Sequence, residues 1–346
     1  MDLVGSPARR PRGGRSARCR GARRRFRKAG AQMKKVLLAV AGTVVLAATA
    51  VVYTVAARPS PAEPSKVEHL SLAPGQLFFR STKTGNVGVV PLANPGAEPK
   101  FSDLKCDRFA VSASTGMCLA VRPGTLPAVS DFSILDRNFT TTHKDYLPGT
   151  PSRARVSPDG KRVYWTVFVT GDSYAATGFS TRAGVYQLDN GELEKTIEEL
   201  PVLVEGKRYF SSDVNYWGIT FSKDGKRFYS TLGSKGKTYL IEGDYDTYRG
   251  KALRENVECP SLSPDETRIA FKKKVGEGVW RLSVLDLETM RETALAETRS
   301  VDDQALWQDD HTILYGLENA VWAVPADGSG APRKLVSDAG SPAVTS

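Results

Sequence analysis

The sequence predicts an all-β fold, a six-bladed β-propeller preceded by one N-terminal hydrophobic helix. Three observations predict it. A turn-centred unit recurs six times after residue 67, segments rich in Val, Ile, Phe and Tyr follow the turns, and one long uncharged stretch stands near the N-terminus. The composition, with 40% hydrophobic and 9% aromatic residues among 346, excludes a chain that is disordered throughout and a coiled coil.

The basic charge of the chain is concentrated at its N-terminus. The first 35 residues hold 13 Lys and Arg side chains and one acid, Asp2, and therefore carry +12. The whole chain carries +10, so residues 36–346 together carry −2 and do not predict nucleic-acid binding. We interpret residues 1–32 as a basic disordered tail, or as sequence translated from a mis-set start, because Met33 begins a complete export signal.

Residues 33–57 are expected to form either a signal peptide or a transmembrane anchor. The stretch 36–57 has no charged side chain and would span about 33 Å as a helix, enough to cross a bilayer. Lys34 and Lys35 precede it, which favours a cytoplasmic N-terminal side, and its Ala-rich end offers small-x-small cleavage sites. Either alternative places the following domain outside the cytoplasm, by the general or the twin-arginine export route.

The recurring unit is a β-hairpin whose clearest copy spans residues 156–165 and contains the turn Ser-Pro-Asp-Gly. In such a turn Pro presets φ, Asp binds its own backbone and Gly accepts a positive φ. The serine-equivalent positions of the six copies are 73, 112, 157, 222, 263 and 308, and four of the five steps between them are 39 to 45 residues, close to the length of a propeller blade. We therefore expect a Pro-rich linker over 58–66, the propeller over 67–340 and a C-terminal tail over 341–346.

One step between turns, from Ser157 to Ser222, is 65 residues and thus contains about 20 more than the others. We expect the additional residues to form surface loops, one over 170–182 and one over 190–210. In the first loop Asp172, Tyr174 and Arg182 are candidates for contacting a partner or ligand. A tolerated insertion without function is the alternative.

The unit at Ser157, with its related copies at Ser222 and Ser263, resembles the WD40-like (PD40) repeat of TolB-type β-propellers over about residues 67–338. The resemblance implies an exported protein of the bacterial envelope whose propeller binds a protein or ligand, and it implies no reaction. TolB carries an additional N-terminal α/β domain, for which there is no room between Val67 and Leu77. The resemblance therefore does not extend to a Tol–Pal role.

A candidate binding site follows from the position of the turns. The strand before each turn is expected to be innermost, so residues a few positions before the turns should ring one mouth of the channel. The predicted binding residues there are Arg108, Arg153, Arg155, Asn215, Tyr216, Trp217, Glu258, Asp302, Asp303 and Gln304. The alternative is that these polar side chains only pair with one another and with channel water.

No catalytic residue, metal site or cofactor is predicted. The three histidines lack partners at metal-ligand spacing, and the nucleophile-elbow, Walker and Rossmann motifs are missing. A propeller hydrolase or lyase with an acidic site at the mouth, built from Glu258, Asp302 and Asp303, stays open as the second functional class. Adjacent residues of a strand point to opposite faces, so Asp302 and Asp303 are not expected to act together.

The cysteines agree with an exported domain. Cys106 and Cys118 flank one predicted hairpin and are expected to form a disulfide under oxidising conditions, which leaves Cys259 as a buried free thiol. We expect a monomer that meets the membrane through residues 36–57 and binds an envelope protein or a small ligand. Nucleic acid is not an expected partner.

Overall fold

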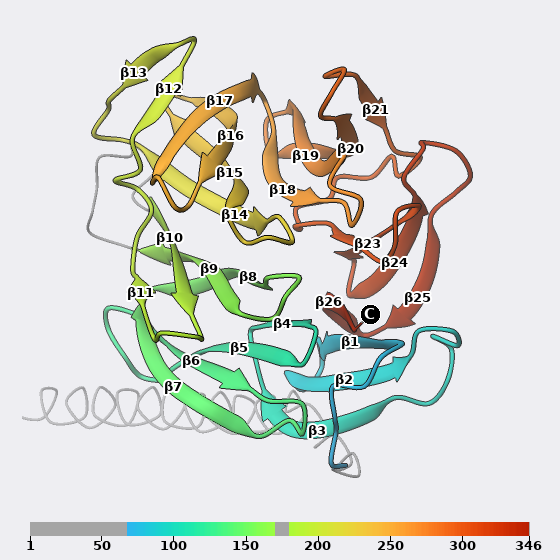
Figure 1. The fold of residues 1–346 in the computed structure, drawn as a ribbon. Coiled ribbons are helices and arrows are strands. Elements are labelled where there is room, and N and C mark those ends of the chain that lie inside the picture. The colour runs from blue at the N-terminus through green and yellow to red at the C-terminus, as the bar shows by residue number, and fades with distance from the viewer. Residues whose placement is uncertain (1–67, 170–179, 346) are drawn as a thin grey trace, which may run out of the picture. The chain divides into compact units, whose positions relative to one another are not determined.

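The computed structural model describes residues 68–169 and 180–345, which form 26 strands in six sheets. The sheets follow one another around a ring as the blades of a propeller (Figure 1). Within these residues, no helix combines the length and apolar character needed to cross a membrane. The all-β six-bladed propeller is confirmed, whereas the tail, the hydrophobic segment and the linker that we expect before residue 67 lie outside the described residues.

Five blades have four strands and the fourth has six, and in every blade the first strand lies next to the channel and the following strands lie successively farther out. The innermost strands are β26 (Ala339–Thr345), β4 (Arg108–Ser112), β8 (Thr150–Val156), β14 (Asn215–Phe221), β18 (Glu258–Leu262) and β22 (Leu306–Trp307). The second strands are β1 (Gln76–Ser81), β5 (Thr115–Val121), β9 (Arg162–Val169), β15 (Arg227–Ser234), β19 (Arg268–Gly276) and β23 (Thr312–Leu317).

The outer half of each blade completes the sheet toward the periphery. The third strands are β2 (Asn86–Pro91), β6 (Val129–Leu135), β10 (Ser180–Gln187), β16 (Lys237–Asp244), β20 (Val279–Asp286) and β24 (Ala320–Pro325). The fourth strands are β3 (Lys100–Lys105), β7 (Thr141–Pro148), β11 (Leu193–Glu194), β17 (Arg249–Glu255), β21 (Glu292–Ala294) and β25 (Arg333–Ser337).

The turns between first and second strands share one set of hydrogen bonds. Ser157 Oγ donates to Asp159 Oδ1 at 2.5 Å and accepts the backbone N–H of Arg162 at 2.9 Å. The turns that begin at Ser222 and Ser263 repeat both contacts. This local chemistry explains why the repeats could be recognised from sequence, since the same side chains build the same turn each time.

The C-terminal strand closes the ring. β26 pairs antiparallel with β1, so that Leu77 lies opposite Val344, and Thr345 Oγ1 accepts the backbone N–H of Gln76 at 3.2 Å. Residues 341–345 therefore belong to the first blade, where the sequence predicts a tail. The physical reason is that the degenerate first repeat has no inner strand of its own, and the exposed edge of β1 takes the C-terminal strand as its partner.

The insertion is more ordered than the sequence suggests. Residues 190–210, expected as a surface loop, contain β11 and the hairpin of β12 (Val202–Val204) and β13 (Lys207–Tyr209), and β12 pairs in parallel with β17. Ile197 and Leu200 are buried in the hydrophobic cluster between the third and fourth blades. The expectation of a long surface loop is wrong for this part, because its apolar side chains extend the core of the fourth blade.

Of the candidate loop residues, only Arg182 lies within the described residues. It is part of β10, where it lies opposite Val167 of β9. Asp172 and Tyr174 lie outside the described residues, so their proposed contacts stay predictions.

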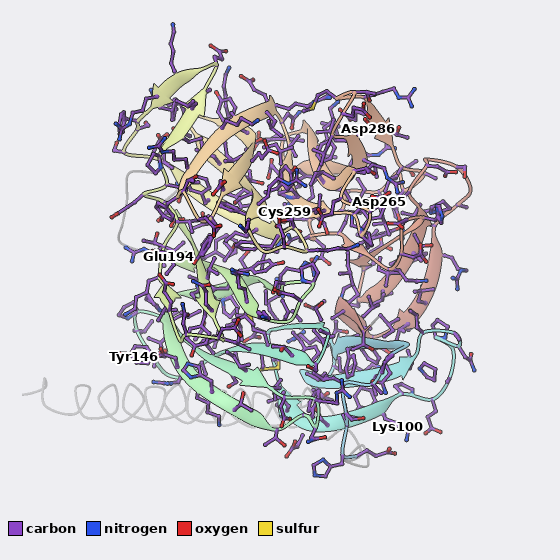
Figure 2. All side chains as sticks on the ribbon, in the orientation of Figure 1. Lys100, Tyr146, Glu194, Cys259, Asp265 and Asp286 are labelled. Carbon is purple, nitrogen blue, oxygen red and sulfur yellow. A yellow bond between two sulfur atoms is a disulfide. The ribbon has the colours of Figure 1, made fainter. Side chains whose placement is uncertain are left out.

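The cysteines are arranged as predicted. Cys106, directly before β4, forms a disulfide with Cys118 of β5 across a Cα–Cα distance of 5.5 Å. Cys259 is a buried free thiol. In the view of Figure 2 its side chain lies near the axis of the ring, whereas Tyr146 and Lys100 lie toward the periphery.

Candidate functional site: the two ends of the channel

The inner strands begin at one end of the channel, which we call the strand-start mouth, and run into the turns at the other. Near the strand-start mouth the registers of three inner-strand pairings shift, between Pro151 and Arg153, between Trp217 and Thr220, and between Glu258 and Ser261. Gly218 has a φ of 68°, and a Cβ there would lie 2.6 Å from Cys259 Cα, so only glycine fits. Such bulges redirect side chains, and here they bring polar groups to the mouth.

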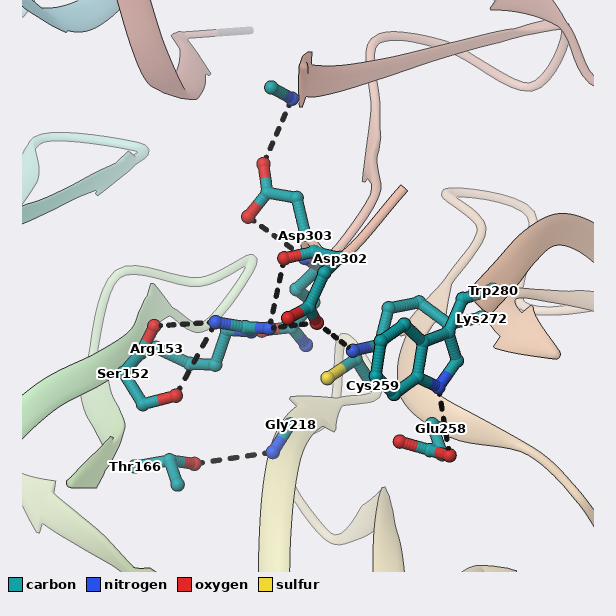
Figure 3. A network of polar contacts seen from close by, with 12 residues as sticks. Ser152, Arg153, Thr166, Gly218, Glu258, Cys259, Lys272, Trp280, Asp302 and Asp303 are labelled. Atoms are coloured by element: carbon teal, nitrogen blue, oxygen red, sulfur yellow. Dashed lines mark hydrogen bonds and ion pairs between the residues drawn. The ribbon is translucent and has the colours of Figure 1, made fainter. Parts of the chain in front are cut away.

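An ion network crosses this mouth (Figure 3). Asp302 Oδ1 accepts from Lys272 Nζ of the fifth blade and lies 3.5 Å from Arg153 Nη2 of the third blade. The side chains of Lys272 and Arg153 are 4% and 12% exposed, whereas that of Asp302 is 63% exposed. One exposed carboxylate of the sixth blade is thus held between two sheltered cations from different blades.

The arginines of the mouth keep their charge at neutral pH. Burial lowers the pKa of Arg153, but the neighbouring Cys259, Asp303 and Asp302 raise it by more, and the net shift is upward. Arg108, whose Nε donates to the carbonyl of Ser152 at 2.6 Å, has a pKa lowered first by burial and then by the charge of Arg153. The mouth therefore holds two neighbouring guanidinium groups, of which Arg153 pairs with the carboxylate of Asp302 and Arg108 donates to backbone carbonyls.

One aromatic and one acidic side chain of the fifth blade, those of Trp280 and Glu258, continue the network. The ammonium of Lys272 lies 4.7 Å from the ring centroid of Trp280, and the Nε1 of Trp280 donates to Glu258 Oε1 at 3.1 Å (Figure 3). Glu258 is buried at 7% exposure. Its carboxylate therefore acts as the acceptor that orients the indole beside the lysine.

Asp302 and Asp303 lie before β22, outside any strand, and accept hydrogen bonds from different partners, although both raise the pKa of Arg153. Asp303 accepts the backbone N–H groups of Gln304 and Gly316, both at 2.9 Å. Gln304 is buried, and its Nε2 donates to the carbonyls of Pro260 at 2.8 Å and Ile219 at 3.3 Å. These two predicted site residues therefore fix backbone from three blades to one another.

The remaining predicted residues divide between the mouth and the core. Tyr216 is fully buried in the hydrophobic cluster between the third and fourth blades and does not face the channel. Its neighbours Asn215 and Trp217 are partly exposed; Asn215 accepts the backbone N–H of Thr181, and the indole of Trp217 packs over Gly233. The prediction of an aromatic pair at the mouth is wrong for Tyr216, because successive side chains of β14 point to opposite faces.

The other end of the channel holds a cavity of about 420 Å³, which we call the turn-end cavity. Residues from the innermost strands of all six blades line it, among them Phe221, Leu262, Trp307 and Val344. Arg155, which we expected at the strand-start mouth, lines this cavity instead. The sequence does not predict the cavity, because its apolar wall residues look like ordinary core and its polar residues belong to the strands and turns of six different repeats.

Lys272 and Trp280 are not among the predicted site residues, and they lie on the second and third strands of their blade. The available signal was a lysine that directly follows the apolar run Ile269–Ala270–Phe271, where a core residue would be expected. Within the described part of the chain, no group of three or more His, Cys, Asp and Glu side chains is placed to hold a metal ion.

No family model matches the sequence, and no curated protein matches it. The structure is similar to TolB from Acinetobacter baumannii, with a TM-score of 0.56 and 17% identity over 79% of this chain and 67% of that chain. It is also similar to a chain of a nidogen/laminin complex, with a TM-score of 0.53 and 14% identity over 78% of this chain and 97% of that chain. At these identities the likeness shows the fold, and the described residues form a TolB-like six-bladed β-propeller.

Proposed function

We propose that this protein is an extracytoplasmic binding module of the cell envelope that contacts an envelope protein through its strand-start mouth. The observation that carries the proposal is the exposed carboxylate of Asp302, which Lys272 and Arg153 hold from two other blades. A charge fixed in this way loses little conformational freedom on binding, which favours affinity and orientation. The complementary partner surface carries a Lys or Arg side chain that reaches Asp302.

Exposed apolar side chains at the same end of the blades support a protein partner. Leu126, Phe168, Val275 and Val279 are 97%, 39%, 55% and 40% exposed. Because β5, β9 and β19 run antiparallel to the inner strands, the ends of these strands and the connections that follow them lie at the strand-start end. Apolar contacts around a polar centre are common in protein interfaces.

The location and the tether rest on other parts of the chain. The Cys106–Cys118 disulfide is typical of proteins outside the cytoplasm. In the proposal, the uncharged stretch 36–57 carries the propeller across the cytoplasmic membrane and anchors it there, unless it is cleaved. The similar nidogen/laminin chain comes from a protein complex, which agrees with a protein partner here.

Affinity capture from an envelope extract tests the proposal, followed by titration of the captured protein in purified form. The wild type and Asp246→Asn, which breaks the exposed Lys226–Asp246 pair away from the mouth, are expected to bind equally well. Asp302→Asn is expected to weaken binding at least tenfold while the thermal unfolding curve stays cooperative. Equal affinity of all three proteins would contradict the proposal.

One further variant, Asp303→Ala, distinguishes the enzyme alternative. A propeller hydrolase or lyase would convert a peptide or polysaccharide of the envelope, and Asp303→Ala would abolish turnover. Turnover that depends on Asp303, with no protein partner captured, would replace the binding proposal with the enzymatic one.

A further inference from the structure

The floor of the turn-end cavity holds an arginine whose charge is poorly compensated. Arg155 Nη2 donates to the backbone carbonyls of Gln304 at 2.9 Å and Ala305 at 2.8 Å, across the channel from its own strand. Among the described residues no carboxylate forms an ion pair with Arg155, and its Nε and Nη1 have no hydrogen-bond acceptor. Burial lowers the pKa of Arg155, and the more distant charge of Asp303 opposes that shift.

The carboxylates at the rim of the cavity are already engaged. Asp159 accepts from Ser157 Oγ and lies 3.9 Å from Arg162. Glu266 accepts the backbone N–H of Lys223 at 2.5 Å and pairs with Arg227 at 3.4 Å. Both acids thus have a cation of their own outside the cavity, and neither compensates Arg155.

A second cation strengthens the positive character of the rim. Lys223 lines the cavity, is exposed, and its ammonium has no ion pair within the part of the chain that the structure describes. With Asp159 and Glu266 neutralised by Arg162 and Arg227, Arg155 and Lys223 leave the cavity with an excess of positive charge. Walls of low polarity increase the attraction of this excess for an anion.

Size and lining restrict the class of ligand. A volume of about 420 Å³ lies within the range of small-molecule sites, and apolar walls with a few polar groups are their usual lining. Phe221, Leu262 and Trp307 supply apolar wall, whereas the exposed turn residues Pro158 and Lys223 form the rim through which the cavity meets solvent.

We propose that the turn-end cavity binds a small organic acid, with its carboxylate on the free Nε and Nη1 of Arg155 and its apolar body against Leu262 and Trp307. The carboxylate supplies the acceptors that the protein does not, and the apolar body excludes water from the contact. This site lies at the opposite end of the channel from the proposed partner surface and does not depend on it.

Matched probes test the charge requirement directly. Phenylacetate and hexanoate are compared with phenylacetamide and hexanamide, which have nearly the same shape without the charge, by ligand-observed NMR and calorimetry on the full chain. We expect at least one acid to bind ten times more tightly than its amide. Equal binding of acid and amide, or binding of no probe, would overturn the proposal.

Variants locate the site. Arg155→Met is expected to abolish the preference for the acid, whereas Arg249→Met, which removes an exposed arginine elsewhere, is expected to keep it. Ser112→Phe narrows the rim of the cavity and leaves Arg155 in place, and it is expected to weaken the binding of the acid at least tenfold. This variant keeps the test valid even if Arg155→Met does not fold. An acid preference that survives both Arg155→Met and Ser112→Phe would place the site elsewhere. Capture of the envelope partner by Ser112→Phe is expected to be unchanged, which separates this proposal from the preceding one.

Discussion

Two arginines of the same strand reach across the channel and meet different partners. Arg153 and Arg155 both extend from β8 in the third blade toward the segment before β22 in the sixth blade, and these blades are opposite one another in a ring of six. Arg153 meets the carboxylate of Asp302, whereas Arg155 meets only backbone carbonyls. The first end therefore presents a charge that is compensated internally, and the second retains a charge that an outside anion can compensate.

The difference between the two ends follows from how well water solvates the charges at each of them. At the strand-start mouth the carboxylate is 63% exposed, so water lowers the cost of bringing three charges together. At the turn end much of the wall is apolar and solvates a cation poorly, so backbone carbonyls provide part of the missing solvation of Arg155. The contrast indicates how one scaffold can support two kinds of recognition, a surface contact at one end and a cavity at the other.

Removal of β26 has the largest expected effect, because this strand closes the ring and lines the turn-end cavity. The deletion of Ala339–Thr345 leaves β1 without its inner partner and removes Ala343 from the wall of the cavity. We expect a loss of about 5 kcal/mol or more in the free energy of unfolding, comparable to the whole stability of many domains. Urea unfolding followed by near-ultraviolet circular dichroism measures it.

The matched control shortens a sheet at its outer edge. Replacement of residues 203–208, which include the β12–β13 turn, by two glycines is expected to keep a cooperative transition, because these residues add only to the outer side of the fourth blade. If the β26 deletion unfolds at the same urea concentration as the wild type, β26 does not close the ring.

What the sequence predicts well is local, and what it misses depends on distant pairing. The backbone preferences of Pro158 and Gly160 and the side-chain hydrogen bonds of Ser157 and Asp159 determine the turn locally, so the repeats predict the number of blades. The strand β26 pairs with β1 more than 250 residues away, and its sequence contains Gly and Pro without an alternating pattern, so nothing local distinguishes it from a tail.

The same distinction applies to the site. Arg153 and Asp302 were both placed at the mouth because their distances from the turns are set by the repeat, and they do form an ion pair. Their common partner Lys272 lies on a second strand, which the repeat assigns to the core, and its approach to the mouth depends on side-chain direction. Tyr216 faces the hydrophobic cluster because its side chain alternates with those of Asn215 and Trp217 along β14, and the repeat alone does not say which of these neighbours faces the channel.

Glu198, on the strand-start side of the molecule, is expected to make the free energy of unfolding depend on pH. This is the second largest effect that we expect. Burial raises the pKa of Glu198 to about 7, against hydrogen bonds from Thr196 and the backbone N–H groups of Ala183 and Tyr216, which lower it. The unfolded chain therefore releases this proton first, and the free energy of unfolding falls by about 3 kcal/mol as pH rises from about 4.5 to about 7. Glu198→Gln is expected to remove this decline in urea titrations, and Glu199→Gln, at an exposed neighbour, to retain it. A decline that persists in Glu198→Gln would assign it to another group.

The turn end responds to pH with the opposite sign. A hydrogen bond from Ser222 lowers the pKa of Asp224, and hydrogen bonds from Ser263 and Thr267 lower that of Asp265 although burial alone would raise it. Lowered values mean that these turns stabilise the fold above pH 3.8 and lose that contribution as pH falls through the folded-state pKa. Amide exchange measured along a pH series therefore should show the segment around Glu198 loosening toward neutral pH and the turns loosening in acid.

Substitutions in the ion network of Asp302, Lys272 and Arg153 have the smallest expected effect on the free energy of unfolding. The difference between removing the carboxylate and removing a cation tests which charge compensates the others at the mouth. Asp302→Asn leaves the sheltered Lys272 and Arg153 without their carboxylate, and we expect a loss of about 1–2 kcal/mol, between the values typical of exposed and buried pairs. Lys272→Met removes a cation that is costly to shelter and leaves Asp302 largely in water, so its expected cost is below about 1 kcal/mol. Asp246→Asn, in an exposed pair, is expected to stay within about 0.5 kcal/mol of the wild type.

The double variant decides between compensation and simple packing at the mouth. If Asp302 mainly compensates the charge of Lys272, then Asp302→Asn lowers the free energy of unfolding less in the Lys272→Met background than in the wild type. The reason is that Lys272, one of the two cations left without a carboxylate, is already absent there. Additive losses, or a larger cost for Lys272→Met than for Asp302→Asn, would mean that the lysine stem and its contact with Trp280 stabilise the mouth through packing. In that case Asp302 would not be held as a fixed charge, and the distinction between a compensated and an uncompensated end of the channel would be lost.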